Sequence, residues 1–439
     1  MTQPLITVIG SLNADLITRT SRIPSAGETL TSQSFDTGFG GKGANQATAC
    51  ARLSRRYDTV ERGELRVKMV GMIGDDAFGQ DIKWPMVSNG IDITDVWLQE
   101  GQKTGVAVII VEEETGENRI LLSPNANYCM KPAQFATIPG RVPDLIVLQL
   151  EIPLETVLRI LEVAYERKIF VIFNPAPAQP LSKEAYKAIR HLIVNESEAA
   201  ILSEAVTLSE TSGSDRSRFS DLPPLPDTPI PSTPSSFSSK APTLRNSSIS
   251  GFSDIGRLSD ASGGLATTAP LNTARSHVSQ PSSSSISSGR ASVISDATID
   301  STSFLSNFTS MAQVFRRLGV KIIIITLGSR GIFLSISGQN FHFPAEPVDV
   351  VDTTAAGDTF VGAYAVAIAK YRSRNHTTNQ ILSAAKWANK CAAKTVEKKG
   401  AQSAIPWLNE VAPFRLEEFE WDEIACRQGV VVTPSVSAT

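Results

Sequence analysis

The residues best suited to chemistry lie near the C-terminal end of the chain, in the stretch Asp352-Thr-Thr-Ala-Ala-Gly-Asp358, at the start of an apolar helical segment. The free N–H groups and the dipole at the start of a helix attract an anion such as phosphate. The small residues Ala355, Ala356 and Gly357 leave room for that anion. The carboxylate of Asp358 could then accept a proton from a hydroxyl group that attacks phosphorus. An N-cap role for Asp358 is the simpler alternative, but it explains one residue and not the whole string.

A second candidate is the glycine-rich stretch Gly38-Phe-Gly-Gly-Lys-Gly-Ala-Asn45. It matches the GxGxxG pattern of dinucleotide-binding folds, but no long buried strand precedes it and no acidic residue follows at the expected distance. It is not a P-loop, because Lys42 is followed by glycine instead of Ser or Thr. Gly41 lacks a Cβ, so backbone N–H groups could approach a ligand, and Lys42 and Asn45 add donors. A glycine-rich turn before a helix is the alternative.

Two further polar stretches follow apolar runs, Asn195-Glu-Ser-Glu198 and Thr326-Leu-Gly-Ser-Arg-Gly331. Ligands of open α/β sheets bind beyond the carboxyl ends of the strands. A glycine-rich turn there can seat a nucleotide, and a carboxylate can hold Mg²⁺ through water. Taken alone, each stretch could equally be an ordinary turn between a strand and a helix.

The elements that must position these residues are short apolar runs that alternate with helical segments. The runs are continuous (IVLQL, VIFN, LIVN, IIIITL), as in parallel strands covered by helices on both faces. The alternation predicts an α/β fold with a doubly wound, mostly parallel sheet. Residues of about 13–36 and 96–122 alternate polar and apolar instead. They predict a small second β-sheet that could cover a site as a lid.

A serine-rich segment interrupts this pattern, since 27 of the residues from 201 to 300 are serine. Such a composition buries too little apolar surface to offset the entropy of ordering, so we expect a disordered insertion over 206–308. Residues 1–205 and 309–425 would then form one domain, with 426–439 as a tail. Thr228, Thr233, Ser259 and Ser292 match sites that protein kinases phosphorylate. A tolerated loop without a role is the alternative.

Charge and composition exclude several classes of protein. The net charge of −3 over 439 residues provides no strong basic field for nucleic acid. No apolar run is long enough to span a bilayer, and the first residues carry no secretory signal. The four cysteines have no metal-binding spacing and read as reduced thiols. We expect a cytoplasmic location, with a nuclear one in addition.

Two of the polar stretches together resemble the signature motifs of the PfkB carbohydrate kinase family, in particular of its ribokinases. They are GGKGANQA, which contains Gly41, and DTTAAGDTF, which contains Asp358. The segments around Asn13, Glu151 and Asn174 also look ribokinase-like, and the resemblance covers about 5–205 and 311–408. It implies a ribokinase-like fold with a lid that forms a homodimer. It also implies transfer of the ATP γ-phosphoryl group to O5 of D-ribose, giving D-ribose 5-phosphate and ADP.

The resemblance assigns roles to individual residues. Asp358 would be the catalytic base, with an anion hole at Ala355, Ala356 and Gly357. The sugar would be bound by this base and by Asn13, Asp15, Gly41, Lys42, Asn45 and Glu151. ATP would be held by Asn195, Thr326, Gly328, Ser329, Gly331, Gly357 and Asn389.

The resemblance also implies two metal ions. Glu198 would organise Mg²⁺ through water. A monovalent cation, expected to be K⁺, would be bound by Asp352, Thr354, Thr395, Lys398, Gly400 and Ala404, several of them through backbone carbonyls. Ribokinases typically have serine at the last of these positions, so Ala404 removes one side-chain oxygen.

Other functions remain open. Another PfkB kinase could phosphorylate fructose, an adenosine-like nucleoside or a keto-sugar acid. A catalytically inactive sugar sensor is a second possibility, although Asp358, Gly357 and Glu198 are all present. An NAD-dependent dehydrogenase would require a cofactor-binding acid that the sequence does not contain.

Overall fold

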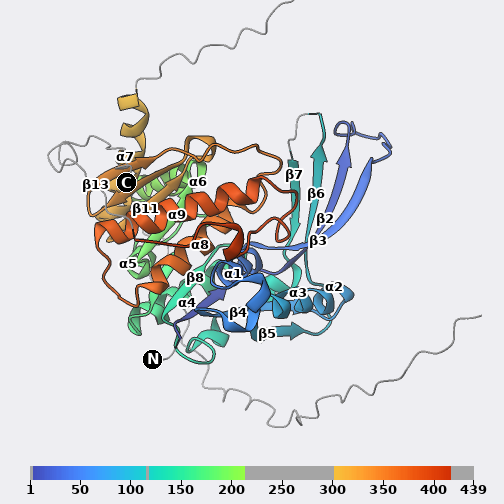
Figure 1. Cartoon of the computed structure of the whole chain (residues 1–439), viewed down its shortest axis with the longest axis horizontal. Coiled ribbons are helices and arrows are strands. Elements are labelled where there is room, and N and C mark those ends of the chain that lie inside the picture. The colour runs from blue at the N-terminus through green and yellow to red at the C-terminus, as the bar shows by residue number, and fades with distance from the viewer. Residues whose placement is uncertain (1–2, 115–117, 213–300, 417–439) are drawn as a thin grey trace, which may run out of the picture. The chain divides into compact units, whose positions relative to one another are not determined.

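The computed structural model describes residues 3–114, 118–212 and 301–416. Its main sheet has nine strands in the order β13-β12-β11-β10-β9-β8-β1-β4-β5 (Figure 1). Neighbouring strands from β11 to β5 are parallel, and β12 and β13 are antiparallel additions at one edge. The strands are β1 (Leu5–Ile9), β4 (Arg66–Gly74), β5 (Ile91–Gln99), β8 (Leu145–Leu148), β9 (Phe170–Phe173), β10 (His191–Asn195), β11 (Ile322–Thr326), β12 (Ile332–Ile336) and β13 (Gln339–Phe343).

Helices cover both faces of this sheet, which explains why its central strands are continuously apolar. Alternate residues of β1 enter opposite cores, with Val8 on one face and Ile9 on the other. The first core contains α1 (Lys42–Leu53), α8 (Ala356–Lys370) and α9 (Thr378–Val396). The second contains α4 (Leu154–Glu166), α5 (Lys183–Ala188), α6 (Glu196–Ser212) and α7 (Ser301–Arg317). The short helices α2 (Ala77–Asp81) and α3 (Lys83–Ser88) precede β5. The predicted doubly wound α/β fold is therefore confirmed.

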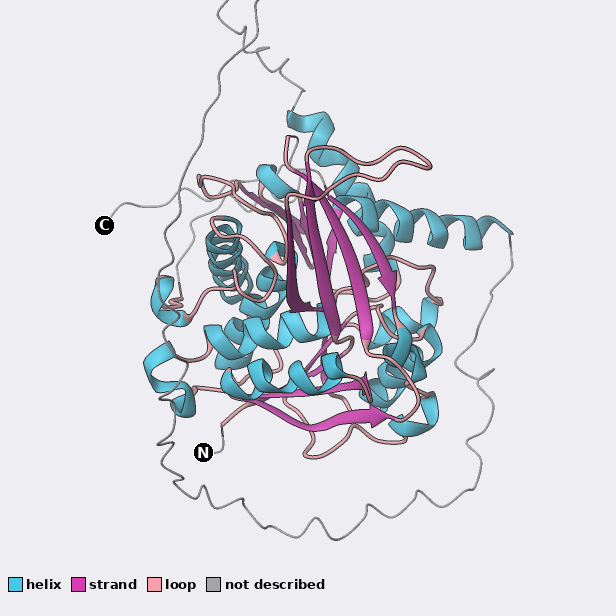
Figure 2. Ribbon diagram, turned by 90° about the vertical axis from the view of Figure 1, so that its right-hand side faces the viewer, coloured by secondary structure: helices cyan, strands magenta, loops and turns pink. Residues whose placement is uncertain are grey.

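A second sheet of four strands has the order β3-β2-β6-β7 (Figures 1 and 2). Its strands are β2 (Asn13–Thr20), β3 (Ser34–Gly40), β6 (Gly105–Glu112) and β7 (Asn118–Ser123). The predicted lid segment of about 96–122 begins too early, because Val96–Gln99 pair with β4 in the main sheet. As an edge strand that is only partly covered, β5 has the same alternating pattern as a lid strand.

The insertion predicted over 206–308 has helical ends. Helix α6 continues to Ser212 and α7 begins at Ser301, because Val206 and Phe308 are buried against the apolar face of the sheet. The rest of that segment, with the four candidate phosphorylation sites, lies outside the described residues, as does the tail at 426–439. The described residues on both sides of it belong to one compact unit. Within the ranges described, no helix is both long and apolar enough to cross a membrane.

Candidate active site

Five neighbouring parallel strands, β11, β10, β9, β8 and β1, end at one edge of the main sheet. Several of the predicted site residues lie at or shortly after these ends, as Asn13 follows β1, Glu151 follows β8 and Asn195 ends β10. The N-terminal ends of α1 and α8 bring the glycine-rich stretch and Asp358 to the same place, since α1 packs against α8. The fold therefore assembles one polar site from segments that are far apart in the sequence.

Asp358 lies in the first turn of α8 and is only 7% exposed. Its two carboxylate oxygens accept hydrogen bonds from the amides of α1. Asn45 Nδ2 donates to Oδ2 at 3.0 Å, and Gln46 Nε2 donates to Oδ1 at 2.9 Å. Both bonds fix the direction of the carboxylate. The N-cap of α8 is Ala355, with no side-chain cap bond, so the alternative that Asp358 is an N-cap is wrong.

The start of α8 has the properties of an anion site. Ala355 adopts a left-handed conformation with φ of 61°, and this turn precedes the first helical residue. The N–H of Ala356 donates to Thr353 O, so it is not available as predicted. In the described part of the chain, the N–H groups of Gly357 and Asp358 donate to no protein acceptor. A methyl group at Gly357 would meet no atom within 4 Å, so open space lies beside these donors.

The glycines of the GGKG stretch serve close packing of the backbone. Gly41 has φ of 86°, and a Cβ there would lie 2.9 Å from Asn13 N. A Cβ on Gly43 would lie 2.6 Å from Ser11 N. The start of α1 therefore contacts the turn after β1 directly. This contact accounts for the two glycines.

The predicted sugar residues form a buried polar group next to Asp358. Glu151 Oε2 accepts hydrogen bonds from Ser11 Oγ at 2.6 Å and from the N–H of Lys42 at 2.9 Å. Asn13 Oδ1 accepts one from Asn127 Nδ2 at 2.8 Å. Burial raises the pKa of Asp15 to about 7, and the nearby carboxylates of Glu151 and Asp358 add to this shift.

Lys42 connects the sugar side of the site with the nucleotide side. Its pKa is raised because the charge of Asp358, together with those of Glu151 and Glu198, outweighs the effect of its burial. Burial raises the pKa of Glu198, and the negative charge of Asp358 acts in the same direction. A cation among several carboxylates at a site with perturbed pKa values is typical of a functional centre.

Three buried amide side chains, those of Gln46, Gln149 and Asn174, form a hydrogen-bonded group that ends at Asp358. Sequence analysis did not assign them a role. Gln46 Nε2 donates to Asn174 Oδ1 at 3.0 Å as well as to Asp358. Gln149 Nε2 donates to Gln46 Oε1 at 2.6 Å, and Asn174 Nδ2 donates to Ile193 O at 3.0 Å. Gln46 lies within the recognised motif and Asn174 follows a strand, which are signals of a site. Ser11 lies in the recognised segment around Asn13, whereas Asn127 carries no comparable signal in the sequence.

Five of the predicted nucleotide residues lie at or after the ends of β10 and β11, whereas Gly357 is on α8 and Asn389 is on α9. Asn195 is the register partner of Thr326, so the two polar stretches meet. Asn195 and Glu198 exchange hydrogen bonds of 2.8 and 2.9 Å between their side chains and backbone N–H groups. Gly328 and Gly331 have φ of 59° and 87° in the turn that contains Ser329. The amide of Asn389, on α9, donates to Pro344 O after β13.

The predicted cation residues join the segment before α8 to the turn after α9. Asp352 accepts hydrogen bonds from the N–H groups of Thr354 and Gly400, both at 2.9 Å. Thr395 Oγ1 donates to Thr359 Oγ1, and the ammonium of Lys398 pairs with Glu410. These side chains already make hydrogen bonds or an ion pair within the protein. A cation here would therefore depend largely on backbone carbonyl oxygens as ligands. Ala404 is fully buried and offers no side-chain oxygen.

In the parts of the chain that the structure describes, no three His, Cys, Asp or Glu side chains cluster as metal ligands. Magnesium in phosphoryl transfer is bound by one or two carboxylates together with phosphates and water, so it requires no such cluster. Glu198, predicted for this role, lies in the first turn of α6 directly after β10, and the charges of Lys42 and Asp358 act on it.

The chain matches known proteins over most of its length. Residues 3–214 and 303–408 match the model of the pfkB family carbohydrate kinases. A protein named ribokinase from Schizosaccharomyces pombe is 35% identical over 412 residues, which cover 92% of this chain and 96% of that protein. A ribokinase from Haemophilus influenzae is 27% identical, covering 93% of this chain and 97% of the relative. The chain belongs to the pfkB family of carbohydrate kinases, as its motifs predicted.

Solved structures agree with the fold. A ribokinase from Thermotoga maritima has a TM-score of 0.61 and 26% identity, covering 94% of this chain and 99% of that chain. A ribokinase from Arabidopsis thaliana, solved with ribose and ATP, has a TM-score of 0.59 and 23% identity, covering 93% and 97%. The ribokinase-like arrangement of a main sheet with a smaller separate sheet is confirmed.

Proposed function

We propose that this chain is an ATP-dependent kinase that phosphorylates D-ribose at O5 and releases D-ribose 5-phosphate and ADP. The observation that carries the proposal is the position of Asp358. Two amides of α1 hold its carboxylate, and unbonded N–H groups and open space lie beside it at the start of α8. The full-length similarity to proteins named ribokinase supports ribose as the sugar.

Catalysis at such a site depends on position and charge, since phosphoryl transfer requires little covalent chemistry from the protein. Asp358 accepts the proton of the O5 hydroxyl as that oxygen attacks the γ-phosphorus. The N–H groups of Gly357 and Asp358, with the dipole of α8, stabilise the negative charge on the transferred group. This anion hole differs from the sequence prediction, because Ala356 N–H is engaged by Thr353 O.

Ribose recognition requires a polar partner for each buried hydroxyl group. The carboxylates of Asp15 and Glu151 provide acceptors, and the ammonium of Lys42 and the amide of Asn45 provide donors. Asn13, whose amide is oriented by Asn127, completes this set. Gly41 contributes by allowing the start of α1 to approach Asn13.

The nucleotide would lie over the ends of β10 and β11, on Asn195, Thr326 and the turn Gly328–Gly331, with Asn389 beyond them. Glu198 would hold Mg²⁺ through water, and the ion would neutralise negative charge on the phosphates. A monovalent cation, K⁺ in our proposal, would be held between the turns that Asp352 connects. Thr354, Thr395, Lys398, Gly400 and Ala404 would contribute carbonyl oxygens there.

The second sheet would close over the sugar as a lid and exclude water. It also exposes apolar side chains, with Phe35, Ile120 and Leu121 each more than half exposed. We propose that this sheet forms a homodimer contact, since a second copy could bury apolar side chains that are exposed on both of its edge strands. The cytoplasmic or nuclear location and the action of protein kinases on the insertion remain predictions from the sequence.

The decisive experiment measures ADP release with D-ribose, fructose, adenosine and a keto-sugar acid, in K⁺ and in Na⁺. We expect D-ribose to give the largest kcat/KM and K⁺ to increase it. Preference for another substrate would assign the chain to a different pfkB activity. Ribose binding without ADP release would indicate the inactive sensor.

A further inference from the structure

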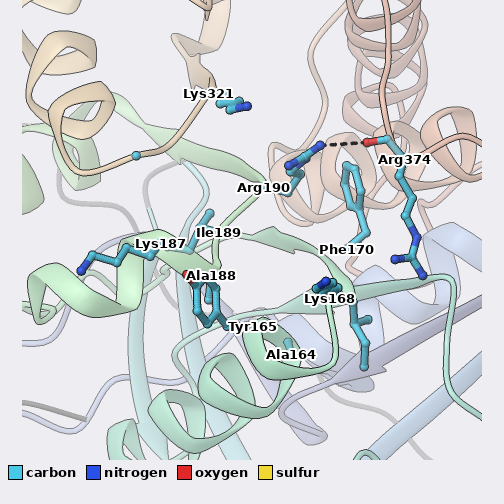
Figure 3. A pocket seen from close by; sticks show the side chains of 12 residues that line it. Ala164, Tyr165, Lys168, Phe170, Lys187, Ala188, Ile189, Arg190, Lys321 and Arg374 are labelled. Carbon is cyan, nitrogen blue, oxygen red and sulfur yellow. Dashed lines mark hydrogen bonds between the residues drawn. The ribbon is translucent and has the colours of Figure 1, made fainter.

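A pocket separate from the candidate active site lies at the opposite edge of the main sheet, where β9, β10 and β11 begin. Its volume is about 380 Å³, which is the size of a pocket for a small ligand. Phe170 at the start of β9, Arg190 before β10 and Lys321 before β11 line it. The other lining residues are Ala164, Tyr165, Lys168, Ile169, Lys187, Ala188, Ile189, Gly319 and Arg374 (Figure 3).

The pocket is strongly basic. Its lining contains five cationic side chains, and none of its lining residues, all within the described part of the chain, is acidic. The ion pairs resolved among the described residues include none of these five. The cationic residues come from five separate segments, and they are Lys168, Lys187, Arg190, Lys321 and Arg374.

Helix dipoles account for only part of this charge. Helices α4, α5, α7 and α8 end shortly before lining residues of the pocket, and cations are favoured at helix C-terminal ends. Each such end carries roughly half a negative elementary charge, so these four contribute about −2 at most. Five cationic side chains exceed this by about three charges. Unless another anion binds in the pocket, this excess positive charge is not compensated.

Lys168 occupies a position that favours glycine. It follows the end of α4 with φ of 54°, and the next residue closes the helix by donating from Ile169 N to Ala164 O at 2.8 Å. Glycine is the usual residue at this left-handed position, because it has no Cβ. The chain places a lysine there at the mouth of the basic pocket instead.

Arg190 is held in place before any ligand arrives. Its Nη2 donates to Arg374 O at 3.1 Å and to Asn375 Oδ1 at 2.9 Å, and the first of these bonds is drawn in Figure 3. Its guanidinium carbon lies 6.0 Å from the centre of the Phe170 ring. Burial lowers the pKa of the neighbouring His376, and the charge of Arg190 adds to this effect. An oriented guanidinium binds a phosphate with little further loss of entropy.

We propose that this pocket binds a small phosphate-bearing metabolite at a site separate from the active site. The cations would bind the phosphate, and the apolar surface of Ile169, Phe170 and Ile189 would contact the organic part. Strand β10 separates the two sites, since Arg190 precedes it and Asn195 ends it. At about 3.3 Å per residue, the strand places them roughly 17 Å apart.

The test uses the full chain and isothermal titration calorimetry with pyrophosphate. Saturating ribose and a non-hydrolysable ATP analogue occupy the proposed active site during the titration. The variant Lys187→Gln/Lys321→Gln removes two exposed cations of the pocket. The matched control, Lys83→Gln/Lys131→Gln, removes two lysines outside both sites. Thermal unfolding verifies that all three proteins are folded.

We expect wild type and control to bind pyrophosphate equally, with an affinity that falls as salt increases. The pocket variant should bind at least tenfold more weakly. Equal affinity in the two variants, or no binding by wild type, overturns the proposal. AMP and orthophosphate, titrated in the same way, distinguish an organic phosphate from inorganic phosphate as the ligand. Because the comparison of variants does not involve ADP release, it is independent of the proposed kinase activity.

Discussion

Gln46 and Asp358 are 312 positions apart in the sequence, yet Gln46 Nε2 donates a hydrogen bond of 2.9 Å to Asp358 Oδ1. This bond joins the N-terminal half of α1 to the first turn of α8, and thus joins the two motifs of the family. Gln46 also contacts Asn174 and Gln149, which follow β9 and β8. The orientation of the proposed base therefore depends on four separate segments of the chain.

Replacing Asp358 with Asn should abolish most of the activity. The variant cannot accept the hydroxyl proton, so kcat should fall by about 10²–10⁴, the usual contribution of general-base catalysis. Ribose affinity, measured by calorimetry, should change much less. A kcat near that of wild type would contradict the role of Asp358.

Replacing Gln46 with Leu should reduce both stability and kcat. The change leaves the buried amides of Gln149 and Asn174 without their partner, at a cost of about 1–3 kcal/mol in the free energy of unfolding. Urea denaturation and ADP release measure the two effects. Gln33→Leu is the matched control in an exposed loop, and both quantities should stay near wild type there.

Replacing Gly357 with Ala should lower the activity without lowering the stability of the protein. A methyl group at this position meets no atom within 4 Å, so the protein should be as stable as wild type. The methyl group would enter the open space beside the free N–H groups, so kcat should fall at least tenfold.

Gly43→Ala provides the contrast to Gly357→Ala. Its Cβ would lie 2.6 Å from the backbone of Gly10 and Ser11, so the variant should be destabilised by about 1–3 kcal/mol. If Gly357→Ala lost stability as Gly43→Ala does, the space at Gly357 would be structural and not a ligand site.

Replacing Asp15 with Asn should stabilise the free protein, and more so at pH 8 than at pH 5. The pKa of Asp15 is about 7 in the folded protein and 3.8 in the reference state. Folding therefore becomes less favourable as pH rises between these values. The difference corresponds to at most about 4 kcal/mol above pH 7. Denaturation at both pH values measures it, with Asp36→Asn as the exposed control. The absence of any gain at pH 8 would contradict the raised pKa.

Replacing Ala404 with Ser tests the proposed cation site. The residue is fully buried, so an unsatisfied hydroxyl group should lower the melting temperature in a large organic cation such as choline. If the cation lies there, K⁺ should bind the new oxygen and recover much of the loss. An equal loss with and without K⁺ would place the cation elsewhere.

Sequence patterns were sufficient to predict the main sheet, because strands that are buried on both faces have continuous apolar runs. They failed at Val96–Gln99, where an edge strand has the same alternation as a lid strand. They placed Asp358 and Lys42 in a site from local motifs alone. They gave no role to Gln149 or Asn127, since these residues acquire a function only through partners that folding brings near. The basic pocket was also not apparent, because its cations come from five segments that are unremarkable individually.

The base of the second sheet is itself part of the proposed sugar site. Asn13 and Asp15 are residues of β2, and β3 ends at Gly40, immediately before the turn into α1. If the second sheet swung outwards as a rigid body, it would withdraw these two side chains from Glu151 and Asp358. Admission of the substrate and assembly of its binding residues would then be a single movement, so an open form of the enzyme would have little affinity for ribose.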